Sequence, residues 1–176
     1  MSRSLIALVL AAMASTADAA PAAKPLTFAL VPKLLDNPVF NYARVGAEKR
    51  ARELGGISIV WRAPQEADAA KQVEIIEALV ATRVDGIAVS CNEPSALKPA
   101  IDKAVAAGIP VITFDSDSPL SKRLTYYGIN DFACGRILGE QLARETGGRV
   151  DVVILTGKLG AFNLDERMRG VKAALK

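Results

Sequence analysis

The sequence predicts an α/β fold, a doubly wound parallel sheet with the strand order 2-1-3-4-5. Three observations carry this prediction: short apolar runs alternate with amphipathic helix patterns, the runs are largely apolar throughout, and most of them end in a polar cluster. The runs expected to form strands cover residues 26–31, 57–61, 86–90, 110–114, 124–129 and 150–156. Five strands are enough for one open sheet in this common order.

Capping residues mark where the expected helices begin. Asn37 and Pro38 are typical of a helix cap and a first helical position. The second helix has a one-sided apolar stripe, and Asn163 with Glu166 three residues later predicts a capping box. The expected helices cover residues 38–54, 67–82, 94–108, 132–145 and the stretch from 163 onward.

Residues 1–19 have the pattern of a secretory signal peptide: the basic residue Arg3, a short apolar stretch at 5–14, and an A-x-A end at 17–19. The apolar stretch is shorter than the ~20 residues that a membrane-spanning helix needs. Residues 20–25 form a small-residue leader without a helix or strand pattern. We expect an exported, soluble protein of the periplasm.

The rest of the chain divides into two parts. Residues 26–129 contain five expected strands and form a Rossmann-like lobe, whereas residues 130–176 supply a sixth strand and helices that this sheet does not need. One strand cannot build a second sheet, because its backbone groups would have no partners. The sequence therefore predicts a whole N-terminal ligand-binding lobe and the incomplete beginning of a C-terminal α/β lobe.

Composition argues against several classes of function. The 22 basic and 19 acidic residues give a net charge of +3 and are interspersed, so no nucleic-acid-binding stripe is expected. The chain contains no histidine, the commonest general base and metal ligand, and no phosphate-loop or dinucleotide motif follows a strand. We expect no enzyme activity, no metal and no cofactor. Cys91 at a strand end and Cys134 inside a helix leave the disulfide state open.

The polar clusters after the strands predict a small-molecule site, because ligands of parallel sheets bind outside the carboxyl ends of the strands. Asp115 directly follows an apolar strand, where its carboxylate can accept hydrogen bonds from two adjacent hydroxyls of a polyol. The alternative for Asp115, and equally for Asp117, is a turn-forming role in this loop. Two acids in one turn do not flank a bond from opposite sides, so glycosidase chemistry is not favoured.

Residues near the first strand are further candidates for ligand contact. Lys33 precedes a helix N-terminus, where the helix dipole does not favour a cation, so we expect it to meet a ligand oxygen or Asp115. A solvated loop lysine is the alternative. Asn37 is first a helix cap, and its amide reaches a ligand only if the side chain points outward. Phe40 either lies against the apolar face of a sugar or packs into the core.

These segments together resemble the periplasmic sugar-binding proteins of the ribose/galactose type, the type I periplasmic binding proteins. The resemblance is carried by residues 31–33, 36–40, 85–90, 107–117, 130–135 and 166–170, and it covers nearly all of the expected mature chain. It implies a monomeric, non-enzymatic receptor whose two lobes close on a sugar or polyol and deliver it to the permease of an ABC importer. It also implies a hinge near residues 129–130 and a chain that stops inside its second lobe.

The resemblance also implies roles for individual residues. Asn37 and Phe40 match ligand contacts in the first helical turn, and Asp115 matches the acid that holds the sugar hydroxyls. Asn92 is the expected substitute for an asparagine that contacts ligand in the ribose binder, because Cys91 occupies the position that aligns most directly.

Two departures from the ribose binder change the expected ligand. Ser116 and Asp165 stand where the ribose binder has arginine, which argues against ribose. Residues 32–33, 115–117 and 165–166 are more similar to the branch of rhamnose and autoinducer-2 binders. In that branch the residues that match Lys33 and the aspartates, Asp165 among them, contact the ligand.

Alternatives to an importer receptor come from other uses of the same fold. A periplasmic sensor that reports ligand occupancy to a membrane kinase or chemoreceptor, or an autoinducer-2 receptor, stays open. The effector domain of a sugar-responsive repressor is disfavoured, because the signal peptide stands where a DNA-binding segment would precede the first strand. A micromolar binder has a binding free energy of about −8 kcal/mol. If a chain that stops inside its second lobe keeps half of the ligand contacts, about −4 kcal/mol remains, so this chain should bind at about millimolar affinity.

Overall fold

The computed structural model describes residues 24–149 and 151–176 of the chain. The predicted signal peptide and residues 20–23 of the predicted leader lie outside the described residues. Within the described part of the chain, no helix has both the length and the apolar character that crossing a membrane requires.

A five-stranded parallel sheet organises the first part of the chain, with the order β2-β1-β3-β4-β5. Its strands are β1 (Leu26–Val31), β2 (Ile57–Trp61), β3 (Gly86–Val89), β4 (Val111–Phe114) and β5 (Thr125–Tyr127). Interior strand β1 pairs on both sides: Phe28 lies opposite Ile59 of β2 and Gly86 of β3. The predicted fold class and strand order are confirmed.

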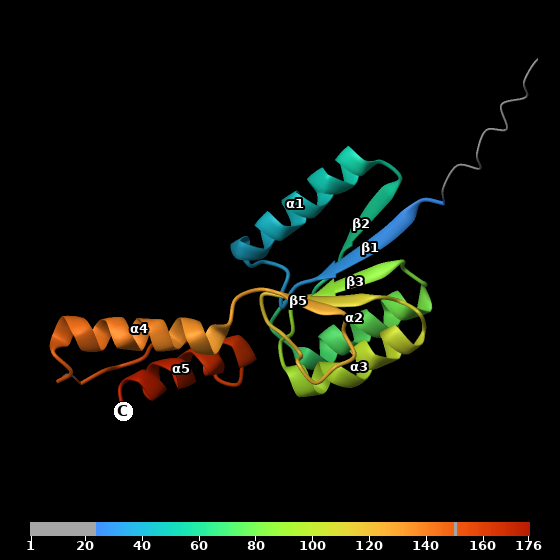
Figure 1. The fold of residues 1–176 in the computed structure, drawn as a ribbon. Helices are drawn as coiled ribbons and strands as arrows, with labels where there is room; N and C mark the ends of the chain where they lie inside the picture. The colour runs from blue at the N-terminus through green and yellow to red at the C-terminus, as the bar shows by residue number, and fades with distance from the viewer. Residues whose placement is uncertain (1–23, 150) are drawn as a thin grey trace, which may run out of the picture.

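The helices are α1 (Pro38–Leu54), α2 (Ala69–Ala81), α3 (Pro94–Ala106), α4 (Asp131–Thr146) and α5 (Phe162–Ala174). Figure 1 shows α1 on one side of the sheet and α2 and α3 on the other, while α4 and α5 form a pair that extends away from it. The side chains of Asn37, Asp68, Glu93 and Asn130 each accept a backbone N–H in the first turn of α1, α2, α3 and α4. The predicted cap at Asn37 is therefore confirmed.

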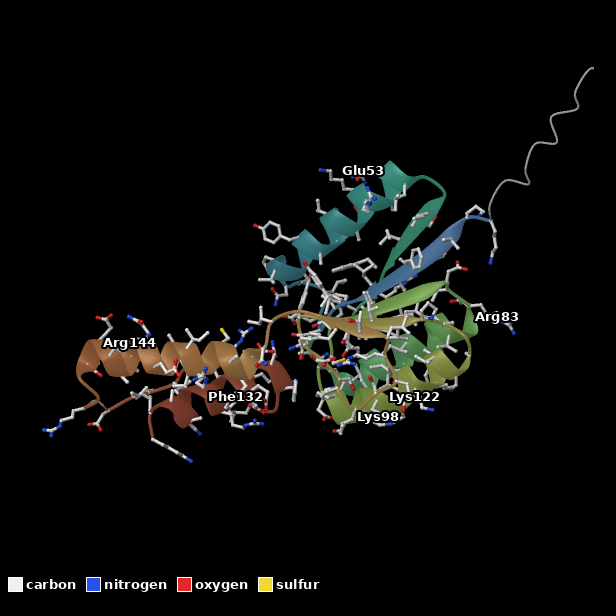
Figure 2. The ribbon with its side chains drawn as sticks, in the orientation of Figure 1. Glu53, Arg83, Lys98, Lys122, Phe132 and Arg144 are labelled. Atoms are coloured by element: carbon white, nitrogen blue, oxygen red, sulfur yellow. The ribbon has the colours of Figure 1, made fainter. Side chains whose placement is uncertain are left out.

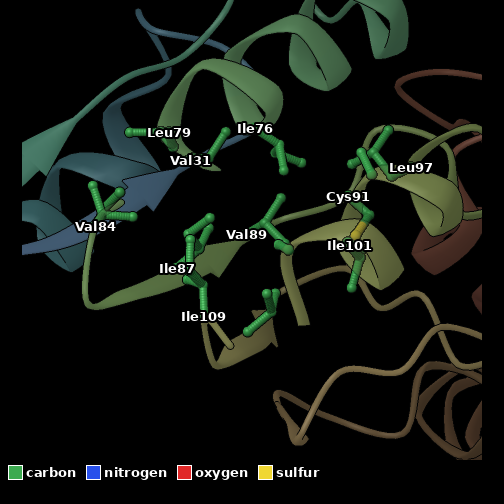
Figure 3. Close-up of a cluster of buried hydrophobic side chains, with 14 residues drawn as sticks. Val31, Ile76, Leu79, Val84, Ile87, Val89, Cys91, Leu97, Ile101 and Ile109 are labelled. Atoms are coloured by element: carbon green, nitrogen blue, oxygen red, sulfur yellow. The ribbon is translucent and has the colours of Figure 1, made fainter. Parts of the chain in front are cut away.

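The main hydrophobic core lies between the sheet and helices α2 and α3 (Figure 3). Val31 and Val89 from the sheet pack here with Ile76 of α2 and Leu97 of α3, all of them buried. Cys91 is buried in the same core as a free thiol, whereas Cys134 on α4 is free and exposed. The buried apolar face fixes the sheet rigidly, and so it fixes the positions at which the strand ends present their polar side chains.

Glycine lets helices α4 and α5 approach each other until their backbones touch. A Cβ placed on Gly135 of α4 would lie 2.0 Å from the backbone oxygen of Arg167, and one on Gly170 of α5 would lie 2.1 Å from that of Phe132. A side chain at Gly135 would therefore clash with the backbone of α5, and a side chain at Gly170 would clash with the backbone of α4. Gly139 of α4 and Val171 of α5 are also buried, whereas Ile137 and Leu138 on α4 are exposed.

The prediction of a strand at residues 150–156 is wrong for residues 151–156. Residues 151–156 are not in a strand, and residue 150 lies outside the described residues. Val153 and Leu155 are 95% and 97% exposed, although their apolar character is typical of a buried strand. The physical reason is that no strand of the described residues lies beside this segment: the sheet ends at β5, and a strand needs a second strand to satisfy its backbone groups.

The capping box predicted at Asn163 and Glu166 is also wrong. Helix α5 begins one residue earlier, with Ala161 at the cap position and no side-chain hydrogen bond to its first turn. Asn163 is buried inside the first turn, and its side-chain oxygen accepts a hydrogen bond from the Lys33 ammonium group. A contact with the first lobe therefore replaces the local cap that the sequence pattern suggested.

We expect Gly135→Ala to weaken the packing of α4 on α5, because the added Cβ would lie 2.0 Å from a backbone oxygen. Overpacking of this kind costs about 1–3 kcal/mol, which urea unfolding followed by circular dichroism measures. Gly46→Ala in α1 is the matched control, since nothing lies within 4 Å of its added Cβ and alanine stabilises a helix by about 1 kcal/mol relative to glycine. Equal stability of the two variants would contradict the close approach.

Candidate ligand-binding site

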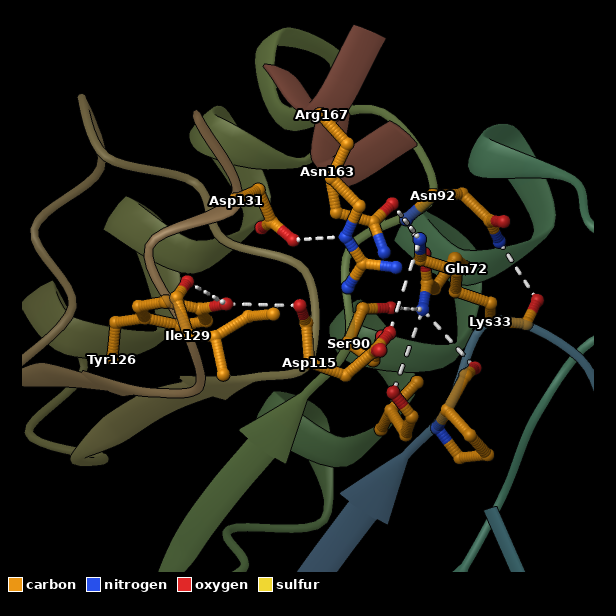
Figure 4. Close-up of polar contacts among 12 residues, drawn as sticks. Lys33, Gln72, Ser90, Asn92, Asp115, Tyr126, Ile129, Asp131, Asn163 and Arg167 are labelled. Atoms are coloured by element: carbon orange, nitrogen blue, oxygen red, sulfur yellow. Dashed lines mark hydrogen bonds and ion pairs between the residues drawn. The ribbon is translucent and has the colours of Figure 1, made fainter. Parts of the chain in front are cut away.

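The polar ends of β1, β3 and β4 meet the first turns of α4 and α5 in one cluster of side chains (Figure 4). Asp115, directly after β4, is at its centre. Its Oδ2 atom accepts a hydrogen bond of 2.7 Å from Ser90 Oγ and lies 3.9 Å from Lys33 Nζ. The side chain remains 33% exposed. Asp115 is therefore anchored on one side by protein groups and open on the other.

The backbone of Asp115 is held in an unusual conformation. Its φ of 59° lies in the left-handed region, which aspartate and asparagine adopt more readily than other non-glycine residues. The N–H donates to Tyr127 O at 3.2 Å, and the carbonyl accepts from the Tyr126 hydroxyl at 2.9 Å. Burial raises the pKa of Tyr126 to about 12, so this hydroxyl stays a hydrogen-bond donor at neutral pH. Strand β5 thereby aims the Asp115 side chain at the cluster.

Lys33 joins the two parts of the chain. Its Nζ donates to Asn163 Oδ1 at 2.8 Å and forms the ion pair with Asp115, while only 13% of its side chain is exposed. Burial lowers the pKa of Lys33, and the charge of Asp115 opposes that fall. The sequence left open a ligand oxygen, Asp115 or solvent as its partner. The structure shows that Asp115 and Asn163 are its partners within the protein.

Arg167 is a site residue that the sequence reasoning did not single out. Its Nε donates to Asp131 Oδ1 at 2.7 Å, and this carboxylate is buried at the start of α4. Burial raises the pKa of Asp131, while the hydrogen bond and charge of Arg167 act against that rise. The signal was present: Asn163 and Arg167 are four residues apart, so they share the face of α5 that Lys33 contacts.

A pocket of about 330 Å³ brings the charged and aromatic groups together. Asp115 and Arg167 line it with Phe40, which is buried and packs edge-to-face on Phe114 with ring centroids 6.2 Å apart. The two alternatives for Phe40 are thus compatible, since it packs in the protein and also faces this pocket. A carboxylate, a guanidinium group and the aromatic rings of Phe40, Phe114 and Tyr127 around one pocket suit a small molecule with both hydroxyls and an apolar face.

The asparagines of the predicted site have structural roles. Asn37 accepts a hydrogen bond of 3.1 Å from the Val39 N–H as the cap of α1. Asn92 is buried; its side chain donates to Lys33 O at 2.8 Å, and its backbone N–H donates to Gln72 Oε1 at 3.0 Å. Asn92 therefore fixes the turn that carries Lys33. Whether either asparagine also contacts a ligand stays a prediction.

Asp117 and Asp165 do not line the pocket of Asp115. Burial raises the pKa of Asp117, but hydrogen bonds from Arg123, Thr113 and the Ser118 N–H outweigh it and hold the pKa below its ordinary value. Asp165 instead lines a separate pocket of about 450 Å³ between α3, the loop after β4 and the first turn of α5. Ligand contacts of these two aspartates stay predictions that this geometry does not favour.

Gln72 is a second residue that sequence reasoning missed. It is fully buried on α2, where its Nε2 donates to Ser90 O at 2.7 Å and to Pro32 O at 3.1 Å. Its Oε1 accepts the N–H of Asn92, so one amide joins the ends of β1 and β3. Its position in the sequence could have indicated this role. Gln72 lies one turn before Ile76, on the buried face of α2, where an apolar residue is normal.

Within the described residues, no three histidine, cysteine or acidic side chains lie close enough together to hold a metal ion. The cluster instead offers hydrogen-bond donors and acceptors: the Asp115 carboxylate, the Lys33 ammonium and the Arg167 guanidinium groups. A parallel α/β sheet with such groups outside its strand ends is the arrangement of a small-molecule-binding lobe.

Comparison with known proteins gives the family of this lobe. Residues 28–176 match the family described as periplasmic binding protein domain, and the chain belongs to this family. The predicted type I periplasmic binding protein family is therefore confirmed, whereas its branch of rhamnose and autoinducer-2 binders stays a prediction.

The most similar relatives include several sugar-binding proteins. The ribose import binding protein RbsB of Haemophilus influenzae is 32% identical over 177 residues, 98% of this chain and 59% of that protein. A solute-binding protein from Burkholderia graminis, solved in complex with D-arabinose, is 39% identical with a TM-score of 0.81, covering 86% of this chain and 52% of its own. GanP, a glucose-galactose binding protein from Geobacillus stearothermophilus, is 33% identical with a TM-score of 0.79. The match covers 85% of this chain and 53% of GanP. The chain thus spans about half the length of these relatives.

We expect Gln72→Leu to destabilise the protein, because it leaves the buried carbonyls of Pro32 and Ser90 and the N–H of Asn92 without their partner. Each buried group left unpaired costs about 1–3 kcal/mol, and urea unfolding measures the sum. Gln141→Leu on the exposed face of α4 is the matched control and should change stability little. Similar losses in both variants would contradict a special role for Gln72.

The depressed pKa of Asp117 predicts a pH-dependent contribution to stability. The contribution is present above the unfolded-state pKa of about 3.9 and is lost as the pH falls through the lower, folded-state pKa. We therefore expect Asp117→Asn to lower the free energy of unfolding at neutral pH and to match the parent chain in strong acid. Urea unfolding at both pH values measures this; a difference that persists unchanged in strong acid would disprove the linkage.

Proposed function

We propose that this chain is the ligand-binding part of a periplasmic solute receptor for a monosaccharide or sugar-like polyol. The observation that carries the proposal is the open side of the Asp115 carboxylate, which faces a pocket shared with Arg167 and Phe40. The family of the chain and the names of its relatives support the same class of ligand.

The chemistry of the pocket matches a sugar. The Asp115 carboxylate can accept hydrogen bonds from adjacent hydroxyls, and the Arg167 guanidinium group can donate to ring or hydroxyl oxygens. The rings of Phe40 and Phe114 offer an apolar surface for the C–H face of the ring. Each hydrogen bond to a charged group contributes about 1.5–3 kcal/mol. These groups suit binding and orienting a ligand, and the family of the chain consists of binding proteins, so we propose a receptor and not an enzyme.

We propose that ligand binding brings the two parts of the chain together. The predicted boundary near residues 129–130 lies between β5 and α4, and the Lys33–Asn163 hydrogen bond spans it. A ligand between Asp115 and α5 would contact both parts at once, which is how hinged receptors favour their closed state. Delivery to the permease of an ABC importer, as a monomer, completes the proposal. Asn37, Asn92, Asp117 and Asp165 are not required by it.

A ligand titration followed by nuclear magnetic resonance tests the proposal, since it detects the millimolar affinity expected of this chain. The probes are D-arabinose, D-ribose, D-allose, D-galactose, L-rhamnose and autoinducer-2. We expect one of them to bind, and Asp115→Asn to weaken it by about 10- to 150-fold, the value of one charged hydrogen bond. Asparagine tolerates the left-handed backbone of this position, so the fold should survive.

Glu48→Gln, on the α1 surface, is the control that should leave the affinity unchanged. Binding that is equally strong in Asp115→Asn would contradict the assigned site, and binding of none of the probes would contradict the proposed ligand class.

A further inference from the structure

We propose that the ion pair of Asp117 and Arg123 is a positioning element for Asp115: it does not touch the ligand but sets where the Asp115 carboxylate points. This inference rests on the proposed function, in which Asp115 contacts the ligand. It gives Asp117 a role different from the ligand contact that the sequence suggested, and it gives Arg123 a role that the sequence did not suggest.

The ion pair is short, two-pronged and largely shielded from water. Arg123 Nε and Nη2 donate to Asp117 Oδ1 and Oδ2, each at 2.5 Å, and the two side chains are only 20% and 11% exposed. Thr113 Oγ1 donates to the same carboxylate at 2.5 Å, and the Ser118 N–H donates at 2.7 Å. Paired geometry of this kind fixes orientation as well as adding energy.

These contacts enclose Asp115 on both sides in the chain. Thr113 precedes it by two residues and Asp117 follows it by two, and the hydrogen bond between them closes the loop around it. Ser116 is fully buried, and its carbonyl accepts the N–H of Cys91 at 3.0 Å. A left-handed residue costs free energy, so it persists only where its surroundings hold it. At Asp115, with a φ of 59°, the Tyr127 carbonyl and the Tyr126 hydroxyl hold the backbone from β5. The hydrogen bond between Thr113 and Asp117, whose carboxylate Arg123 fixes, adds a constraint from within the loop.

A second carboxylate anchors the same loop without enclosing Asp115, and it provides the control. Asp102 Oδ1 accepts the N–H of Lys122 at 2.6 Å, while Oδ2 pairs with Lys98 Nζ at 2.5 Å. Figure 2 shows Lys98 and Lys122 close together at α3, and neither the Lys98 nor the Lys122 contact of Asp102 involves a residue labelled in Figure 4. Asp102 therefore stabilises the loop through contacts that do not enclose Asp115.

The pKa of Lys33 reports where the Asp115 carboxylate lies, and it needs no ligand. Burial lowers this pKa, and the charge of Asp115 is the largest influence that raises it. Cys91 and Asp131 raise it less, and Arg167 lowers it. If the ion pair positions Asp115, its loss moves the carboxylate away from Lys33 Nζ, now 3.9 Å distant, and the pKa falls.

The experiment is a pH titration of the chain with ¹³C-methylated lysines, followed by nuclear magnetic resonance. We expect the pKa of Lys33 to fall in Asp117→Asn and in Asp115→Asn, and the double variant to match Asp115→Asn alone. Asp102→Asn should leave the pKa of Lys33 unchanged. An unchanged pKa in Asp117→Asn, or a further fall in the double variant, would overturn the proposal, because the ion pair would then not act through Asp115.

Arg123→Lys keeps the proposal testable if Asp117→Asn does not fold. It preserves the charge and removes the two-pronged geometry, so we expect a smaller fall in the Lys33 pKa; no fall would again overturn the proposal. The sugar titration is a separate readout, in which the same variants should lose about tenfold in affinity. If no sugar binds but the Lys33 titration behaves as expected, the proposed function fails while the positioning role stands.

Discussion

The contacts of the largely buried Lys33 ammonium group with Asp115 and Asn163 are the interactions on which the arrangement of the site depends. It is the point where the end of β1, the Asp115 carboxylate after β4 and the first turn of α5 come within hydrogen-bonding or ion-pair distance. A charge that is 13% exposed must be neutralised and hydrogen-bonded, because desolvation would otherwise destabilise the fold. The positions of Asp115 and Asn163 follow from that requirement. Asn92 and Gln72 then hold the backbone that carries the lysine.

The sheet could be predicted from the sequence because its signal is local. Short runs that form strands of three to six residues alternate with helix patterns and so specify a parallel sheet. A chain of five such units has few acceptable strand orders. The segment 151–156 is also rich in apolar residues, but among residues 24–149 and 151–176 no strand lies beside it, so composition alone gave the wrong answer there. Asn163 failed for a related reason. Its sequence pattern was that of a helix cap, but its side chain accepts a hydrogen bond from Lys33, 130 residues away in the chain.

The site could be predicted only in part. Asp115 was accessible to sequence reasoning because ligand-binding residues follow parallel strands. Asp115 and Asp117 look alike in a turn, however, and what separates their surroundings is a partner six residues later, Arg123, whose approach depends on how the loop folds back to β5. Gln72 and Arg167 were missed because each acts through tertiary contacts: one is a polar side chain on an apolar helix face, and the other is held by Asp131 of the preceding helix.

The glycine contact between α4 and α5 bears on how the second part of the chain would move. Where the backbones of two helices touch, as at Gly135 and Gly170, no side chain lies between them to change rotamer and absorb a displacement. We expect the two helices to move as one body, with any rotation taken up at the short connection that follows Tyr127. A torque applied at the far tip of α4, near Gly147, would thus be felt at Lys33, because Asn163 belongs to the same body.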